Sequence, residues 1–180
     1  MAIQIEKTFQ VKEPIEQVWA LLSDPRRVAM CVPGARVTEQ VNETTYLGAI
    51  TVKVGPSSTD YKGEVQIVRL DAENHEIEIV GKGQDVKGRG SASMKMTGKA
   101  SSLESGGTEV TSVSELNVIG ILAQMGTRVI NEVSNFIFAQ FIKNFQSQLQ
   151  NPGSDTPEAK PLSAASVAWA AAKGAFNRDS

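Results

Sequence analysis

The sequence has few of the residues from which cross-linked, metal-bound and nucleophilic sites are built. Its 180 residues include one cysteine, Cys31, and one histidine, His75. A single cysteine excludes an internal disulfide and fits a reducing compartment. One cysteine and one histidine cannot form a zinc site, which needs several such ligands at short spacing, so we expect no metal. No G-x-G-x-x-G or P-loop motif is present.

Long apolar segments and a strong charge of one sign are also missing. No uncharged apolar run reaches the ~20 residues of a membrane-spanning helix. The start, MAIQIEKTFQ, carries Glu6 and Lys7 where a signal peptide has its apolar region. The net charge of −2 gives no electrostatic footprint for nucleic acid. We therefore expect a cytoplasmic protein that binds no nucleic acid and lies at most peripherally on the inner face of the cytoplasmic membrane.

The polar residues do not assemble into a catalytic set. We interpret His75 as a turn residue, because no orienting partner or pocket is evident for a general base. The segment GKGQDVKGRG (81–90) is interpreted as a hairpin, with Asp85, Lys87 and Arg89 as a solvated charge cluster. Arg128 and Glu132 are spaced as an exposed i,i+4 helix pair. The sequence thus predicts a protein that is not an enzyme.

The hydrophobic pattern changes period three times along the chain. Residues 2–11 alternate as a half-buried strand, and residues 15–22 carry an apolar helical stripe. Asp24 is the predicted N-cap of a second short helix that ends at Pro33-Gly34. A strand pattern with turn signals then continues to about residue 118, and residues 119–149 are predicted as one long helix.

This order of elements predicts an α+β, helix-grip fold. A curved antiparallel sheet of about seven strands would surround the long C-terminal helix, and the two short helices would close one end. We place the ligand-binding domain at residues 1–150. Residues 151–162 are interpreted as a Pro-rich linker and residues 163–180 as an Ala-rich tail that is helical in part.

One predicted strand, residues 86–103, has an unusually small face. Its even-numbered positions are Gly88, Gly90, Ala92, Met94, Met96, Gly98 and Ala100. Two explanations stay open: the glycines allow the sheet to bend, or they leave room for a guest beside adaptable methionines. For the second case we predict a ligand cavity lined by Tyr46, Ile50, Tyr61, Met94, Met96, Leu116, Leu122, Met125, Val129, Val133 and Phe136.

The cysteine lies in the stretch MCVPGARV, directly before the predicted end of the second short helix. Arg27, one helical turn earlier, offers weak activation of a nucleophilic thiol. A free cysteine more often behaves as a small buried hydrophobic residue. We therefore interpret Cys31 as part of a packed corner at one end of the cavity.

Two segments resemble a known family. SDPRRVAMCVPGARV is similar to the signature of the carbon monoxide dehydrogenase G-subunit family, and NVIGILAQMGTRVINEVSNFIFAQF resembles its last strand and grip helix. The matching residues are Cys31, Pro33, Gly34, Gly120 and Gly126. The resemblance covers residues 2–149 and extends to the wider superfamily of START, SRPBCC and birch-pollen-allergen-like ligand-binding proteins.

The resemblance implies a non-catalytic accessory protein of a molybdenum-containing carbon monoxide dehydrogenase or a related hydroxylase. Such a protein recruits the enzyme to the cytoplasmic membrane, holds no tightly bound cofactor and binds a lipid-like guest such as a quinone. An assembly or cofactor-insertion factor, and a cyclase or hydrolase of the same superfamily, are the alternatives.

The tail is the predicted contact with a membrane or a partner protein. The Ala-rich residues 163–176 would form a helix roughly 21 Å long, which is shorter than a ~30 Å hydrocarbon core. Such a helix would lie in the membrane interface. Its predicted contact residues are Val167, Trp169, Lys173 and Phe176.

Overall fold

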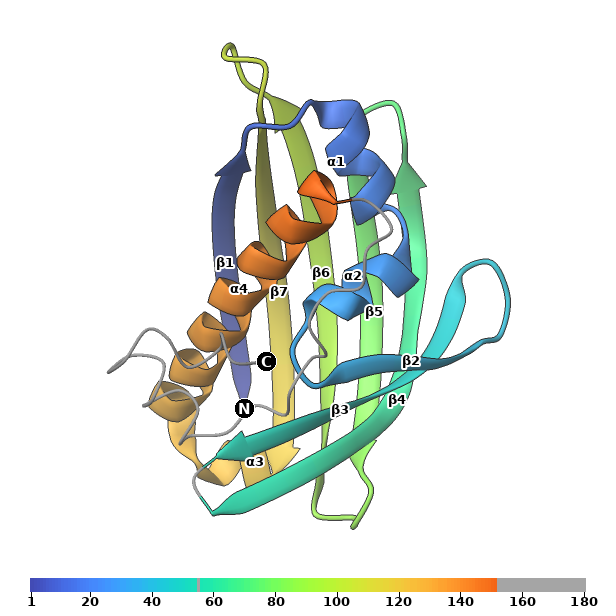
Figure 1. Cartoon of the computed structure of the whole chain (residues 1–180). Coiled ribbons are helices and arrows are strands. Elements are labelled where there is room, and N and C mark those ends of the chain that lie inside the picture. The colour runs from blue at the N-terminus through green and yellow to red at the C-terminus, as the bar shows by residue number, and fades with distance from the viewer. Residues whose placement is uncertain (55, 152–180) are drawn as a thin grey trace.

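The computed structural model describes residues 1–54 and 56–151, and these form one sheet with helices across its concave face (Figure 1). The strands are β1 (Ala2–Val11), β2 (Ala35–Gln40), β3 (Thr45–Val54), β4 (Ser57–Asp71), β5 (Glu76–Asp85), β6 (Gly90–Ser102) and β7 (Thr108–Gly120). The helices are α1 (Ile15–Leu22), α2 (Pro25–Cys31), α3 (Ile121–Gln124) and α4 (Gly126–Gln150).

All neighbouring strands are antiparallel, in the order β1-β7-β6-β5-β4-β3-β2. The first strand therefore pairs with the last, and β2 lies at the opposite edge. Helix α4 runs diagonally over the β1–β7 side of the sheet, while α1 and α2 lie beside its C-terminal end (Figure 1). The predicted helix-grip architecture is confirmed.

The two short helices begin and end where the sequence indicates. The Asp24 carboxylate accepts hydrogen bonds from the backbone N–H groups of Arg26 and Arg27, at 3.1 and 3.4 Å, which confirms it as the N-cap of α2. After α2, Pro33 is buried and Gly34 adopts a φ of 81°, a left-handed conformation that turns the chain into β2.

The prediction of one helix over residues 119–149 is wrong at its start. Strand β7 continues to Gly120, α3 forms a single turn, and α4 begins only at Gly126, where φ is 87°. Gly120 lies against the backbone of Arg89, so that a Cβ atom there would collide with the Arg89 carbonyl oxygen. The apolar residues around position 120 suit a strand and a helix equally, which hides this boundary from periodicity.

The expected hairpin over residues 81–90 is shorter than its sequence suggests. Strand β5 continues to Asp85, and β6 starts at Gly90 rather than at residue 86. The turn between them contains Gly88 at a φ of 73°. Of the glycines in this segment, Gly81, Gly83 and Gly90 lie in paired strands, and Gly88 lies in the turn.

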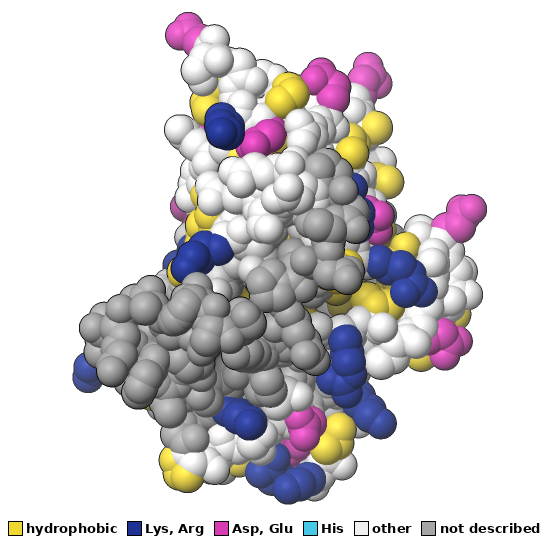
Figure 2. All heavy atoms as spheres, viewed as in Figure 1, with side chains coloured by type: hydrophobic (Ala, Val, Ile, Leu, Met, Phe, Trp, Pro, Cys, Tyr) yellow, Lys and Arg dark blue, Asp and Glu magenta, His cyan; other side chains and the backbone are white. Residues whose placement is uncertain are grey.

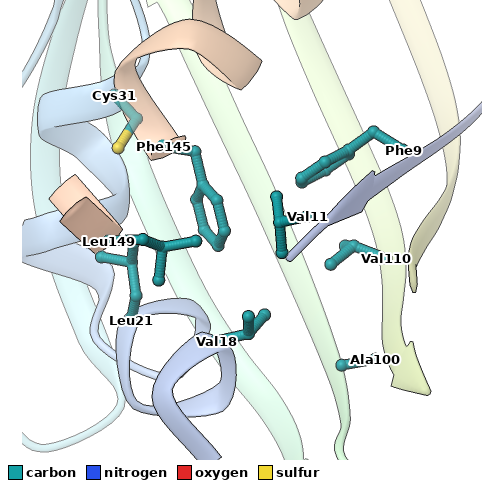
Figure 3. Close-up of a cluster of buried hydrophobic side chains, with 9 residues drawn as sticks. All are labelled: Phe9, Val11, Val18, Leu21, Cys31, Ala100, Val110, Phe145 and Leu149. Atoms are coloured by element: carbon teal, nitrogen blue, oxygen red, sulfur yellow. The ribbon is translucent and has the colours of Figure 1, made fainter. Parts of the chain in front are cut away.

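The largest hydrophobic cluster fills the space between the end of α4, helices α1 and α2, and the β1 side of the sheet. Phe145 is fully buried and meets Phe9 edge to face, with ring centroids 5.5 Å apart (Figure 3). Around this pair lie Val11, Val18, Leu21, Cys31, Ala100, Val110 and Leu149. The cluster anchors α4 at its C-terminal half.

Glycines permit a tight bend across the middle strands. Gly48 pairs with Gly63, and Gly63 pairs with Gly83, so three adjacent strands carry no side chain at this level. A Cβ atom on Gly63 would collide with the Lys82 carbonyl oxygen, and one on Gly48 would lie 2.7 Å from the Arg36 carbonyl oxygen. These close approaches favour a bent sheet at this row. For the face of residues 86–103, the two explanations stay open. At Gly81, by contrast, the nearest atoms would be 3.6 Å away, which is ordinary contact.

This contrast predicts different outcomes for two alanine substitutions. Gly63→Ala forces β4 and β5 apart and is expected to lower the free energy of unfolding by about 1–3 kcal/mol. Gly81→Ala, the matched control, fits without a clash and is expected to leave stability unchanged or raise it by about 0.5 kcal/mol. Urea unfolding followed by circular dichroism measures both. Equal losses in the two variants would contradict the bend.

Candidate functional site

The concave face of the sheet brings together most of the strand residues predicted for the cavity. Cross-strand pairing aligns Tyr46 with Val65, Val65 with Gly81, Gly81 with Met94 and Met94 with Leu116. Met96, one position further along β6, pairs with Ile79. Ile50 pairs with Tyr61 on the other side of the glycine row. These side chains share the face on which the helices lie.

The middle of this face is less well covered than its ends. Ile50, Val65, Met94 and Met96 are only half-buried, although they occupy central strands and face the helices. Within the described part of the chain, none of them belongs to a hydrophobic cluster. One cluster lies around Phe145, a second joins Ile3, Val118 and Ile130 beneath α3, and a third joins Tyr46, Ile67 and Ile77 beneath Trp19.

The helical residues predicted for the cavity divide into two groups. Leu122 packs into the cluster of Ile3, Val118 and Ile130. Val129, Val133 and Phe136 are half-buried and lie on a different side of α4 from Ile130 and Phe145, outside the three clusters. Met125 is half-buried at the junction of α3 and α4. The lining of a cavity by these residues stays a prediction.

The two tyrosines differ in the state of their hydroxyl groups. Tyr46 is 8% exposed, and its oxygen accepts a hydrogen bond from Gln40 Nε2 at 3.2 Å. Tyr61 is 5% exposed, and its buried hydroxyl has no hydrogen-bond partner among the described residues. Burial is the main cause that raises the pKa of Tyr61, with the nearby Asp85 carboxylate second, so this phenol stays protonated at neutral pH.

The interpretation of Asp85 as part of a solvated cluster is wrong. Asp85 is 3% exposed, and its carboxylate accepts hydrogen bonds from the backbone N–H groups of Lys87 and Arg89. Arg89 Nε donates to the same carboxylate at 2.5 Å, and this hydrogen bond is the main cause that lowers the pKa of Asp85. An aspartate directly before a turn can accept hydrogen bonds from the backbone N–H groups of that turn. Hydrophobic periodicity does not detect this local signal.

Cys31 is a packed residue and not an activated thiol. It is fully buried, and its Sγ lies 3.5 Å from the Arg27 carbonyl oxygen. Burial raises its pKa to about 12, and the attraction of the Arg27 charge is too weak to offset this. Its carbonyl oxygen accepts a hydrogen bond from Asn144 Nδ2 at 3.0 Å, which joins α2 to α4.

The remaining candidates have structural roles in what is described. His75 has a φ of 55° in the turn before β5, and its ring meets Trp19 edge to face at 5.4 Å. Arg128 and Glu132 form the expected exposed pair at 3.2 Å. Among residues 1–54 and 56–151, no group of three or more histidine, cysteine or acidic residues could hold a metal ion. The predicted tail residues, Val167, Trp169, Lys173 and Phe176, lie outside the described residues.

The convex face of the sheet carries a groove that the sequence does not predict. Its volume is about 750 Å³, and it crosses the outer side of β2 to β7 at the level of the glycine row. Side chains of both charges line it, together with small polar ones: Arg36, Lys62, Glu64, Lys82, Gln84 and Ser91. On the opposite, helix-covered side, basic and acidic side chains are likewise interspersed (Figure 2).

The fold defines the chain as a helix-grip, START-like protein. It is similar to a conserved protein from Geobacillus kaustophilus, with a TM-score of 0.74, 18% identity and coverage of 82% of this chain and 95% of that one. A START superfamily protein from Mycobacterium smegmatis matches with a TM-score of 0.58 and 10% identity, over 82% and 97% of the two chains. The ZhuI aromatase/cyclase from Streptomyces sp. R1128 matches with a TM-score of 0.61 and 13% identity, and the match covers 83% of this chain and 94% of that one.

The sequence identifies the family more narrowly. The chain belongs to the CoxG family, that of the carbon monoxide dehydrogenase G subunit, whose profile matches residues 8–150. The match includes Cys31, Pro33, Gly34, Gly120 and Gly126, the residues on which the resemblance rested. No curated protein matches the sequence. None of the helices within the described ranges combines the length and apolar character that crossing a bilayer requires.

The buried thiol makes a prediction about alkaline stability. Above pH 9 the unfolded thiol ionises, whereas the folded one stays protonated until about pH 12. The free energy of unfolding should therefore fall with rising pH, by up to about 1.4 kcal/mol per unit from this group. Cys31→Ala is expected to lose a modest amount of stability at pH 7 and to show a shallower decline between pH 8.5 and 10 in urea unfolding. Parallel profiles for the two proteins would show that Cys31 does not cause the decline.

Proposed function

We propose that this chain is a non-catalytic accessory protein of a molybdenum-containing carbon monoxide dehydrogenase, or of a related hydroxylase, and that it carries an apolar guest. Membership of the CoxG family supports the partner. The incompletely covered middle of the concave face is the observation that carries the guest, because an apolar molecule that covered these half-buried apolar side chains would remove them from water, which is favourable.

The walls favour a flat or extended apolar molecule such as a quinone. Met94 and Met96 are flexible and polarisable, and Ile50 and Val65 are fixed aliphatic surfaces on the neighbouring strands. Gly81 lies between Val65 and Met94 and adds no side chain. A molecule that lies across these strands would meet apolar atoms along its length.

A quinone or lipid guest also connects the protein with a membrane, where such molecules dissolve. We infer that the chain works at the cytoplasmic membrane and brings the dehydrogenase to it. Peripheral contact through Trp169 and Phe176 fits this role, since aromatic side chains favour the membrane interface.

The alternatives make different demands on the same residues. An aromatase/cyclase-like activity, as in the similar fold of ZhuI, would need an acid or base that is free to act, but the Asp85 carboxylate is engaged by Arg89 and two backbone N–H groups. An assembly or cofactor-insertion factor would need a face that binds the enzyme and would not depend on a guest. Guest binding therefore separates the carrier from the assembly factor.

The carrier function predicts that the purified protein retains an apolar molecule. Native mass spectrometry after gentle purification from a quinone-producing host is expected to show a bound species that organic extraction removes and that chromatography identifies as a quinone or lipid. Gly81→Leu, which places an aliphatic side chain between Val65 and Met94, is expected to reduce the bound fraction while the circular dichroism spectrum is retained. A protein that is reproducibly free of any such molecule would contradict the carrier function.

The second prediction concerns the membrane. The full chain is expected to co-sediment with vesicles of phosphatidylglycerol and phosphatidylethanolamine, and the chain shortened to end at Asn151 is expected to co-sediment less. Replacement of both Trp169 and Phe176 by alanine in the full chain serves as the matched control, because it keeps the length and charge of the tail. Equal sedimentation of all three proteins would place any membrane contact elsewhere.

A further inference from the structure

The hydroxyl group of Tyr61 lacks a partner in a place where hydroxyl groups normally have one. The residue is 5% exposed, its oxygen is buried, and no described residue accepts or donates a hydrogen bond there. Nearly all buried polar side-chain atoms in folded proteins are hydrogen-bonded, because an unmet donor is destabilising. A molecule that binds only part of the time is one explanation of such a group.

Tyr61 lies beside the less well covered part of the concave face. It occupies the same face of β4 as Val65, and Gly63 is the position between them on that face. Gly63 is flanked by Gly48 on β3 and Gly83 on β5, so no side chain separates the Tyr61 level from the level of Val65, Gly81 and Met94. On this face the two levels are therefore adjacent, with only glycine between them.

The charges near Tyr61 compensate one another. Its cross-strand neighbour is Asp85, whose carboxylate is paired with Arg89, and Arg89 Nη2 also donates to the Ser58 carbonyl oxygen at 3.1 Å. Lys7, a cation on the same face, is on β1 at the far edge of the sheet, where it donates to Asn135. No unpaired cation is thus available beside Tyr61 among the described residues to neutralise an anionic oxygen placed there.

We propose that the Tyr61 hydroxyl donates a hydrogen bond to an uncharged oxygen acceptor of the guest, of the kind that a quinone carbonyl provides. This proposal rests on the carrier function and assigns the guest's polar end to the glycine row and its apolar part to Val65 and Met94. It makes the site selective for ring carbonyl compounds over hydrocarbons of the same shape and over fatty carboxylates.

Two small probes separate the hydrogen bond from apolar contact. 2-Methyl-1,4-naphthoquinone has two ring carbonyls, and 2-methylnaphthalene has the same ring framework without them. Isothermal titration calorimetry of the wild-type protein is expected to show tighter binding of the quinone. Tyr61→Phe removes the donor and keeps the ring, so the quinone affinity should fall about tenfold while the hydrocarbon affinity stays the same. Dodecanoate should bind the wild-type protein more weakly than the quinone does.

The other tyrosine provides the matched control. Tyr46→Phe removes a hydroxyl that Gln40 already engages, in a residue that packs with Ile67 and Ile77, so it is expected to lower the thermal midpoint. Tyr61→Phe removes an unmet polar group, so its midpoint without ligand should equal or exceed that of the wild type. This opposite pair of shifts distinguishes a ligand-directed hydroxyl from one that only supports the fold.

The outcomes also separate this proposal from the carrier function. If the wild-type protein binds both probes and Tyr61→Phe keeps the wild-type affinity ratio, the hydrogen bond is refuted and the carrier function stands. If the wild-type protein binds neither probe, both are refuted. A loss of quinone binding in Tyr61→Phe that is matched by an equal loss of hydrocarbon binding and a lower thermal midpoint would assign Tyr61 a structural role and overturn the proposal.

Discussion

The bend at the glycine row is the constraint on which the rest of the structure depends. Gly48, Gly63 and Gly83 bring three strands so close that a side chain on Gly63 would strike the neighbouring backbone. Without this bend the sheet would be flatter, and α4 could press against its whole width. With it, the central apolar residues Ile50, Val65 and Met94 face the helices but are only half-buried.

The core is consequently divided among separate clusters. Phe9 and Phe145 secure the C-terminal half of α4, and Ile130 secures its N-terminal half near α3. Trp19 covers the third cluster from α1. The two clusters that secure α4 lie at its two ends, away from the proposed guest site. The small substitutions that alter guest contact, such as the removal of one hydroxyl from Tyr61, can therefore be made without dismantling the core.

The sequence predicted the elements whose signals are local. Alternation identified the strands, and Asp24 identified the start of α2, because one carboxylate can satisfy the first free backbone N–H groups. It also predicted that Cys31 is buried. It missed the break between Gly120 and Gly126, since apolar residues there fit either type of element. The burial of Asp85 and the lone hydroxyl of Tyr61 depend on pairing between β4 and β5, which periodicity does not determine.

The pairing of β1 with β7 has a consequence for the order of events during synthesis. Ala2 pairs with Asn117 and Val11 with Thr108, so β1, the first strand synthesised, has no strand partner until β7 has been synthesised. Until then Ile3, Ile5 and Phe9 remain exposed on an unpaired strand, in a chain dominated by contacts between distant residues. Such topologies fold slowly and expose strand edges in the meantime. The alternate positions Gln4, Glu6, Thr8 and Gln10 are polar, and they keep one side of the waiting strand soluble.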